Sequence, residues 1–194
     1  MYPKIIGVCG PKGSGKTLIG EYLRDKYGYL TYAFGGPLKN ILKELFLLTD
    51  DQLNTDLKEE IDPYWNIKPR ELLQKIGTEV CREEMPKHVK CVIPDKIWVQ
   101  RFERWYNNMN ENEYLPERTP VIVTDVRFPE ECESIKKLGG VLWYIKRDIA
   151  ECQVNRDSHK SEVFAVDILN IADLVILNNG TKKELYEYID NMLN

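Results

Sequence analysis

The segment from Gly10 to Thr17 constrains this chain more than any other, because it reads GPKGSGKT and matches the phosphate-loop pattern G-x-x-x-x-G-K-[ST]. The apolar run from Ile5 to Cys9 precedes the loop, and a segment with helical spacing of apolar residues follows it and ends at Gly28. The pattern requires a strand before the loop and a helix after it. We therefore predict these three elements and expect the chain to bind a nucleoside triphosphate.

Each residue of the loop has a physical role in holding phosphate. At Gly13, Ser14 and Gly15 the backbone can turn its N–H groups toward phosphate oxygens. The Lys16 ammonium can reach the β and γ oxygens, and the Thr17 hydroxyl is placed for a magnesium ion. A nucleotide with bound Mg²⁺ is the ligand this combination predicts.

Composition narrows the class of protein. The chain has 194 residues, 43% of them hydrophobic, which suffices for one domain with an insertion. Its 27 basic and 31 acidic residues give a net charge of -4, so we expect no nucleic-acid partner. Five scattered cysteines without a C-x-x-C spacing argue against disulfides and zinc. With no run of 18 apolar residues, we expect a cytoplasmic protein without a membrane span.

Strand and helix patterns alternate along the rest of the chain. Beyond residues 5–9, strands are predicted at 29–33, 121–125, 141–145 and 173–177, and helices at 18–27, 37–48, 70–83, 96–108, 129–138 and 181–193. Thr181 and Glu184 form a capping-box pattern at the last helix. This alternation predicts an α/β fold with a mainly parallel sheet, in which ligands bind at the carboxyl ends of the strands.

The residues after the strand at 121–125 indicate which phosphate chemistry is present. The chain lacks the guanine-reading N-K-x-D of GTPases, and Val126 stands where motor ATPases place a glutamate after the strand-end acid. We expect Asp125 to orient magnesium-bound water and Arg127 to hold the phosphate of an acceptor. A surface ion pair in a turn is the alternative interpretation.

A second polar set lies on the helix predicted after Pro69. Arg70, Gln74 and Thr78 recur every four residues, and Arg82 continues the row. Gly77 would permit close approach of a ligand. This face can bind the base, sugar and phosphate of an acceptor, whereas a plain solvated face would give the same spacing. Trp65 and Trp98 flank the region and are candidates for contact with the acceptor, although tryptophan is more often a core residue.

The polar segment from Arg147 to Glu162 has little periodicity and contains Arg156 and His159. We interpret it as a lid whose cations would close over phosphates and exclude water. An ordinary solvated loop is the alternative.

Five segments of this chain together resemble the bacteriophage-type deoxynucleoside monophosphate kinases of the P-loop kinase superfamily. They are the phosphate loop, residues 32–39 (YAFGGPLK), 69–79 (PRELLQKIGTE), 124–129 (TDVRFP) and 157–162 (DSHKSE). They span most of the chain in the expected order. The helix ending QKIGTE and the lid sequence are the most particular to that family.

The resemblance implies transfer of the ATP γ-phosphate to a deoxynucleoside 5′-monophosphate with Mg²⁺. It implies a three-layer sandwich with a five-stranded sheet in the order 2-3-1-4-5, a helical acceptor-binding insertion at about 37–110 and a lid at about 147–164. The enzyme would be a monomer or homodimer acting on small nucleotides in the cytoplasm, that of a host if the protein is viral.

The candidate site residues, taken together, fall into five groups. Catalysis is assigned to Lys16, Arg127, Arg147 and Arg156, and ATP binding to Gly13, Ser14, Gly15, Lys16, Thr17, Asn179 and Gly180. The acceptor is assigned to Lys39, Trp65, Arg70, Gln74, Thr78, Trp98, Asp125 and Arg127. The lid comprises Asp157, Ser158, His159, Ser161 and Glu162, and the metal is assigned to Thr17 and, through water, Asp125.

Two other functions remain open at this point. The animal phosphomevalonate kinases share the strand-end Asp-Val-Arg and a lid with Ser-Glu, and their acceptor lacks a base. A nucleotide-gated binding module without catalysis also fits the phosphate loop.

Overall fold

The computed structural model describes residues 2–110, 119–148 and 164–193. The chain divides into two compact units. One comprises Met1–Ala33 with Trp105–Asn194 and contains the sheet, and the other, Phe34–Arg104, is helical. The helical unit overlaps the predicted insertion at about 37–110, whose role in binding the acceptor stays a prediction.

The sheet consists of β1 (Ile5–Cys9), β2 (Leu30–Tyr32), β3 (Val121–Val123), β4 (Val141–Lys146) and β5 (Leu174–Leu177). All four pairings are parallel, and the order is β2-β3-β1-β4-β5, which confirms the predicted topology. Gly7 in the central strand pairs with Val123 on one side and Leu142 on the other. Every residue of β1 and β3 is buried, as expected for strands covered on both faces.

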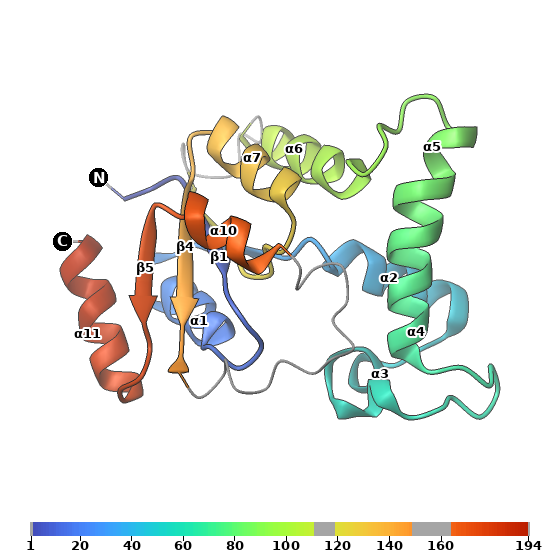
Figure 1. Ribbon diagram of the computed structural model, residues 1–194, viewed down its shortest axis with the longest axis horizontal. Helices are drawn as coiled ribbons and strands as arrows, with labels where there is room; N and C mark the ends of the chain where they lie inside the picture. The colour runs from blue at the N-terminus through green and yellow to red at the C-terminus, as the bar shows by residue number, and fades with distance from the viewer. Residues whose placement is uncertain (1, 111–118, 149–163, 194) are drawn as a thin grey trace. The chain divides into compact units, whose positions relative to one another are not determined.

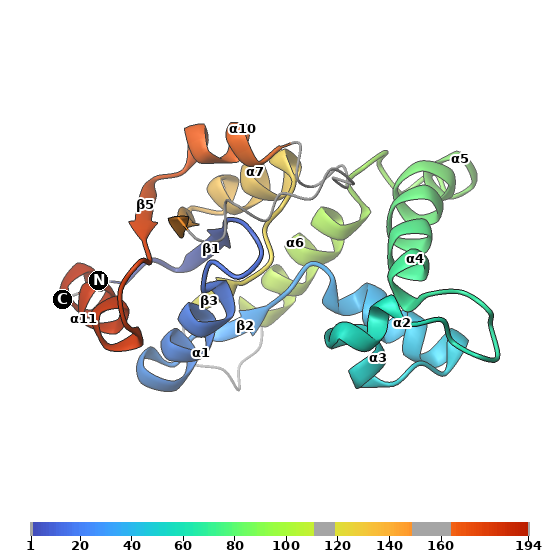
Figure 2. The same ribbon diagram turned by 60° about the horizontal axis from the view of Figure 1, so that its bottom comes forward.

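Helices cover both faces of this sheet, as Figures 1 and 2 show. On one face α1 (Lys16–Tyr27) and α11 (Lys182–Leu193) bury Ile19, Leu23, Leu185 and Ile189 in the core cluster that also contains Trp143. On the other face lie α7 (Pro129–Lys137) and α10 (Ala165–Ile171). The unit is therefore a three-layer α/β sandwich, as predicted.

The helix ends follow their capping signals. Gly28 takes a left-handed φ of 71° just after α1. The capping box before α11 is present, since the Thr181 N–H donates to Glu184 Oε2 at 2.7 Å and the Glu184 N–H donates to Thr181 Oγ1 at 3.3 Å. The sequence did not predict α10, because its seven residues are too few for a periodic pattern to stand out. In the described part of the chain, no helix combines the length and apolarity that a bilayer crossing needs.

The helical unit contains α2 (Gly36–Phe46), α3 (Asp50–Asn54), the 3₁₀ turn η1 (Asp56–Glu59) and α4 (Pro69–Gln74). Next come a π-helix, η2 (Lys75–Glu84), and α5 (Met85–His88). The last helix, α6 (Ile97–Asn110), continues into the sheet unit from Trp105. The single helix predicted at 70–83 is thus α-helical only in its first part.

Two departures from α-helical hydrogen bonding accompany the wide π turns. Pro86 has no N–H to donate into the helical ladder, and the Arg82 carbonyl instead accepts from the N–H of Asp95 at 3.3 Å. The Gly77 carbonyl accepts from Trp98 Nε1 at 3.1 Å, so a side chain inserts into the hydrogen bonding of the helix. A Cβ on Gly77 would lie 2.6 Å from Leu38 Cδ2, so a larger residue here would require the Leu38 side chain to move.

Candidate nucleotide-binding site

The phosphate loop connects β1 to α1, which begins at Lys16, so the predicted strand, loop and helix are confirmed. Gly10, Gly13 and Gly15 have φ values of +129°, +80° and +106°, a region that L side chains rarely adopt. A Cβ on Gly10 would lie 2.2 Å from the Ile145 carbonyl oxygen of β4. Backbone conformation and close packing therefore both require glycine in the loop.

Lys16 is partly buried, and its ammonium contacts backbone carbonyls of the same loop. Its Nζ donates to the carbonyl oxygens of Gly10 at 2.8 Å and Pro11 at 2.6 Å. Burial and then the neighbouring Arg127 cation lower the pKa of Lys16 to about 8, against the opposing effects of Cys9 and Asp125. Lys16, Asp125 and Arg127 thus interact at the carboxyl ends of β1 and β3, where the sequence predicted a site.

The turn that carries Arg127 is held by a buried carboxylate. Glu131 in the first turn of α7 is 2% exposed, and its Oε2 accepts from the backbone N–H of Arg127 at 2.8 Å and of Phe128 at 3.1 Å. The Arg127 side chain itself is exposed. Sequence reasoning missed Glu131, whose signal was an acid three positions after Phe128 at the start of a helix, where it also faces the helix dipole.

The loop residues fit a bound polyphosphate. The Ser14 hydroxyl is fully buried and has no hydrogen-bond partner within the described residues, so it is available to a ligand atom. Lys16 and Arg127 supply positive charge. The exposed Thr17 hydroxyl and the partly exposed Asp125 carboxylate are oxygen donors of the kind that Mg²⁺ prefers.

The ends of β4 and β5 border the loop on its other side. Asn178, 6% exposed, donates from Nδ2 to the carbonyl oxygen of Ser14 at 2.8 Å. Asn179 accepts from the Asp148 N–H at 3.0 Å and donates to Asp148 Oδ2 at 2.6 Å.

Two further predicted residues lie nearby in the chain. Gly180 lines a hollow of about 200 Å³, and Arg147 follows β4 directly. The sequence had indicated Asn179, Gly180 and Arg147 but not Asn178.

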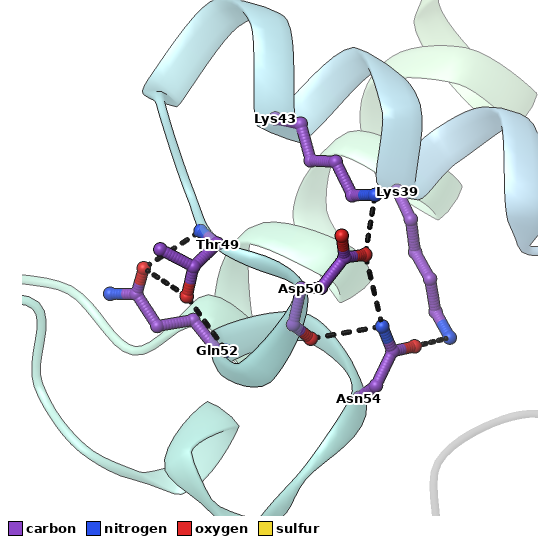
Figure 3. A network of polar contacts seen from close by, with 6 residues as sticks. All are labelled: Lys39, Lys43, Thr49, Asp50, Gln52 and Asn54. Atoms are coloured by element: carbon purple, nitrogen blue, oxygen red, sulfur yellow. Dashed lines mark hydrogen bonds and ion pairs between the residues drawn. The ribbon is translucent and has the colours of Figure 1, made fainter.

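In the helical unit, the predicted acceptor cations all have oxygen partners. Lys39 Nζ donates to Asn54 Oδ1 at 2.6 Å, and Asn54 in turn donates to the Asp50 carbonyl at 2.9 Å (Figure 3). Lys43 forms an ion pair with Asp50 in the same network. Arg70 forms one with Glu59, and both of these side chains are exposed. These contacts connect α2 to α3 and η1 to α4.

The other predicted acceptor residues differ in exposure. Gln74 and Thr78 are partly exposed. Trp65 is 40% exposed and donates from Nε1 to the Phe46 carbonyl at 2.8 Å, whereas Trp98 is 7% exposed and packs inside the helical unit. Arg82 does not continue the exposed row, because it is buried and donates to the Asp95 carbonyl at 2.8 Å.

The acceptor role of these residues stays a prediction. Most residues of the predicted lid lie outside the described residues, namely Arg156, Asp157, Ser158, His159, Ser161 and Glu162.

The parallel sheet ordered 2-3-1-4-5 and the glycine loop with its lysine define a P-loop protein of the kinase type. Sequence comparison narrows this class. A family model described as deoxynucleotide monophosphate kinase matches residues 48–189. The chain is 38% identical over 190 residues to a putative deoxynucleotide monophosphate kinase of Acanthamoeba polyphaga mimivirus, covering 95% of this chain and 93% of that one. The chain therefore belongs to the deoxynucleotide monophosphate kinase family.

Other relatives agree with this assignment. The deoxynucleotide monophosphate kinase of Escherichia phage RB69 is 28% identical over 133 residues, which are 69% of this chain and 47% of that protein. Two solved structures share the fold, TT1252 from Thermus thermophilus (TM-score 0.52, 19% identity, 100% and 97% of the two chains) and the dephospho-CoA kinase of Campylobacter jejuni (TM-score 0.51, 14% identity, 99% and 98%).

Proposed function

We propose that this protein transfers the γ-phosphate of ATP to a deoxynucleoside 5′-monophosphate and releases ADP and the diphosphate. The observation that carries the proposal is the grouping of Lys16, Asp125 and Arg127 beside the phosphate loop, in a chain of this family. Two cations and one acid at strand ends match the needs of phosphoryl transfer, which depends on positioning and charge neutralisation.

Each residue of the grouping has a distinct part in the proposed reaction. The loop N–H groups and Lys16 bind the donor phosphates, which take the place of the carbonyl partners that Lys16 has here. Arg127 holds the acceptor phosphate and stabilises the charge that spreads during transfer. No side chain acts as a strong base, because a monoester phosphate is largely doubly ionised at pH 7.

A magnesium ion would be held by Thr17 and, through water, by Asp125. When bound, it would neutralise charge on the phosphates of the nucleotide. The proposed enzyme acts on small nucleotides in the cytoplasm, as a monomer or homodimer.

We assign recognition of the acceptor to the helical unit. Lys39 and Arg70 would exchange their present oxygen partners for acceptor phosphate or sugar oxygens, and Gln74 and Thr78 would contact the base or sugar. Trp65 offers an exposed ring for stacking, whereas the buried Trp98 would act by shaping the region. Arg147, Arg156 and the residues at 157–162 complete the proposal as a closing lid.

An ADP-release assay with Mg-ATP and a panel of ribo- and deoxynucleoside monophosphates plus phosphomevalonate tests the proposal. We expect turnover with at least one deoxynucleotide and its loss in the Lys16→Ala variant. Turnover with phosphomevalonate alone would replace the proposed acceptor. ATP binding without turnover on any acceptor would indicate a binding module.

A further inference from the structure

A buried contact joins the last strand to the phosphate loop. Asn178 stands at the end of β5, and its Nδ2 donates to the Ser14 carbonyl at 2.8 Å. Both residues are buried, at 6% and 0% exposure. A carbonyl buried in this way needs a partner, because an unpaired buried acceptor has lost its hydrogen bonds to water without a replacement. The Asn178 amide is therefore a structural partner of the loop rather than an incidental neighbour.

Gly15, which follows Ser14, shows how closely the Asn178 amide approaches the loop. A Cβ on Gly15 would lie 2.4 Å from Asn178 Nδ2 and would displace this amide, and the φ of +106° at Gly15 also favours glycine. Gly15 thus serves two purposes at once. The Ser14–Gly15 peptide lies directly against the Asn178 side chain.

The geometry of the peptide bond links the Asn178 contact to the direction of a loop N–H group. In a planar trans peptide, the C=O of one residue and the N–H of the next point in opposite directions. No peptide bond in the described residues is cis. When Asn178 fixes the direction of the Ser14 carbonyl, the Gly15 N–H is fixed in the opposite direction within the same peptide plane.

Asn178 is itself held by the sheet. Its backbone N–H donates to the Lys146 carbonyl of β4 at 2.8 Å, which continues the parallel pairing of the two strands. The orientation of the loop peptide is thereby tied to the rigid part of the unit. Preorganised N–H donors bind anions without a cost of reorganisation at the moment of binding.

We infer that Asn178 is a positioning residue, which orients the Ser14–Gly15 peptide so that the Gly15 N–H donates to a nucleotide phosphate. The inference rests on the proposed function only in that nucleotide phosphate occupies the loop. It adds a residue that does not touch the nucleotide and acts through the backbone.

Two substitutions at this position separate the hydrogen bond from the packing. Asn178→Asp keeps the shape but replaces the donor with a carboxylate, and Asn178→Ala removes both. We expect both variants to bind ADP roughly 10- to 100-fold more weakly in calorimetry. The affinity of Asn178→Asp should be no higher than that of Asn178→Ala. We expect KM for ATP to rise more than KM for the acceptor.

Thr181→Ala is the matched control. It removes the capping box of α11 three residues away, so it should lower the Tm and leave the ADP affinity intact. Wild-type ADP affinity in Asn178→Asp would overturn the inference. So would an equal loss in Thr181→Ala, or no ADP binding by the unaltered protein. If ADP binding follows the expected order but no deoxynucleotide accepts phosphate, the proposed function fails and the positioning role stands.

Discussion

The phosphate loop and the helical unit position their phosphate-binding N–H groups and their cations, respectively, by different means. In the loop, backbone conformation decides the geometry, because three glycines with positive φ and packing against β4 and β5 fix the N–H groups. In the helical unit, Lys39, Lys43 and Arg70 are placed by contacts between side chains, most of them exposed. Exposed pairs of this kind contribute only about 0–1 kcal/mol each.

This difference suggests a division of work between the two regions. Under the proposed function, the polyphosphate common to all donors would be bound by backbone groups that a side-chain substitution cannot easily move. The base and sugar, which vary between acceptors, would be bound by side chains that can exchange partners at little cost. Substitutions in the sheet unit should therefore change the rate, and those in the helical unit should change the choice of substrate.

The largest effect is expected at Lys16. Lys16→Met should lower kcat/KM by about 10²- to 10³-fold, because a preorganised cation is lost from the transferring phosphate. The same variant should raise the Tm by a few degrees, since burial of the charge at neutral pH is relieved. Steady-state kinetics and thermal unfolding measure both, with Lys4→Met as an exposed control.

The pH dependence of that stability difference has a defined sign. The folded pKa of Lys16 is about 8, below the ordinary value of 10.5 for lysine, so between these values the unfolded chain holds a proton that the folded one lacks. The wild type should gain stability relative to Lys16→Met as the pH rises through this window. A constant difference would contradict the lowered pKa.

Arg127→Ala should reduce kcat/KM by about 10²-fold, because the acceptor phosphate loses its cation. ADP affinity should change much less, since the donor is held by the loop. Comparing the kinetics with calorimetric ADP binding checks this split. Near-normal turnover of Arg127→Ala would contradict the assignment of Arg127 to the acceptor phosphate.

Binding of ADP should require uptake of a proton by Lys16 above pH 8. The phosphates favour the charged ammonium, so the apparent affinity should fall by about tenfold per pH unit above pH 8. Calorimetry in buffers of different ionisation enthalpy measures the uptake directly. A flat affinity between pH 7 and 9.5 would show that the charge of Lys16 does not change in this range.

Glu131→Ala should lower kcat by about tenfold, because the backbone of the Arg127 turn loses its acceptor. Glu131→Gln retains one amide oxygen that can accept these bonds and should recover most of the activity. Equal losses in the two variants would mean that the carboxylate charge, rather than the hydrogen bonding, is what matters.

The smallest change in rate is expected at Gln74. Gln74→Ala should change the ranking of acceptor bases by a few-fold while leaving the best kcat within about threefold, in keeping with one neutral hydrogen bond of about 1 kcal/mol. The acceptor panel described above provides the measurement. An unchanged ranking would count against contact between Gln74 and the base.

Patterns local in the sequence were predicted well. The phosphate loop, the five strands and the capping box at Thr181 depend on spacing within a few residues, and all are present. Contacts between distant segments could not be predicted. The bond from Asn178 to Ser14 joins positions 164 residues apart, and the carbonyl of Gly77 meets Trp98 across a turn with no sequence signal.

The π-helix has a consequence for the row Arg70, Gln74, Thr78 and Arg82. A four-residue step slightly exceeds one α-helical turn, which takes 3.6 residues, but it falls short of one turn of the wider π-helix. Successive members of the row are therefore displaced around the axis in opposite senses before and after Gln74, and Arg82 reaches the interior. The number of residues per turn thus changes partway along this helix. Deleting one residue from η2 would re-aim every side chain beyond it, so the length of this segment is itself part of how the helical unit presents its polar face.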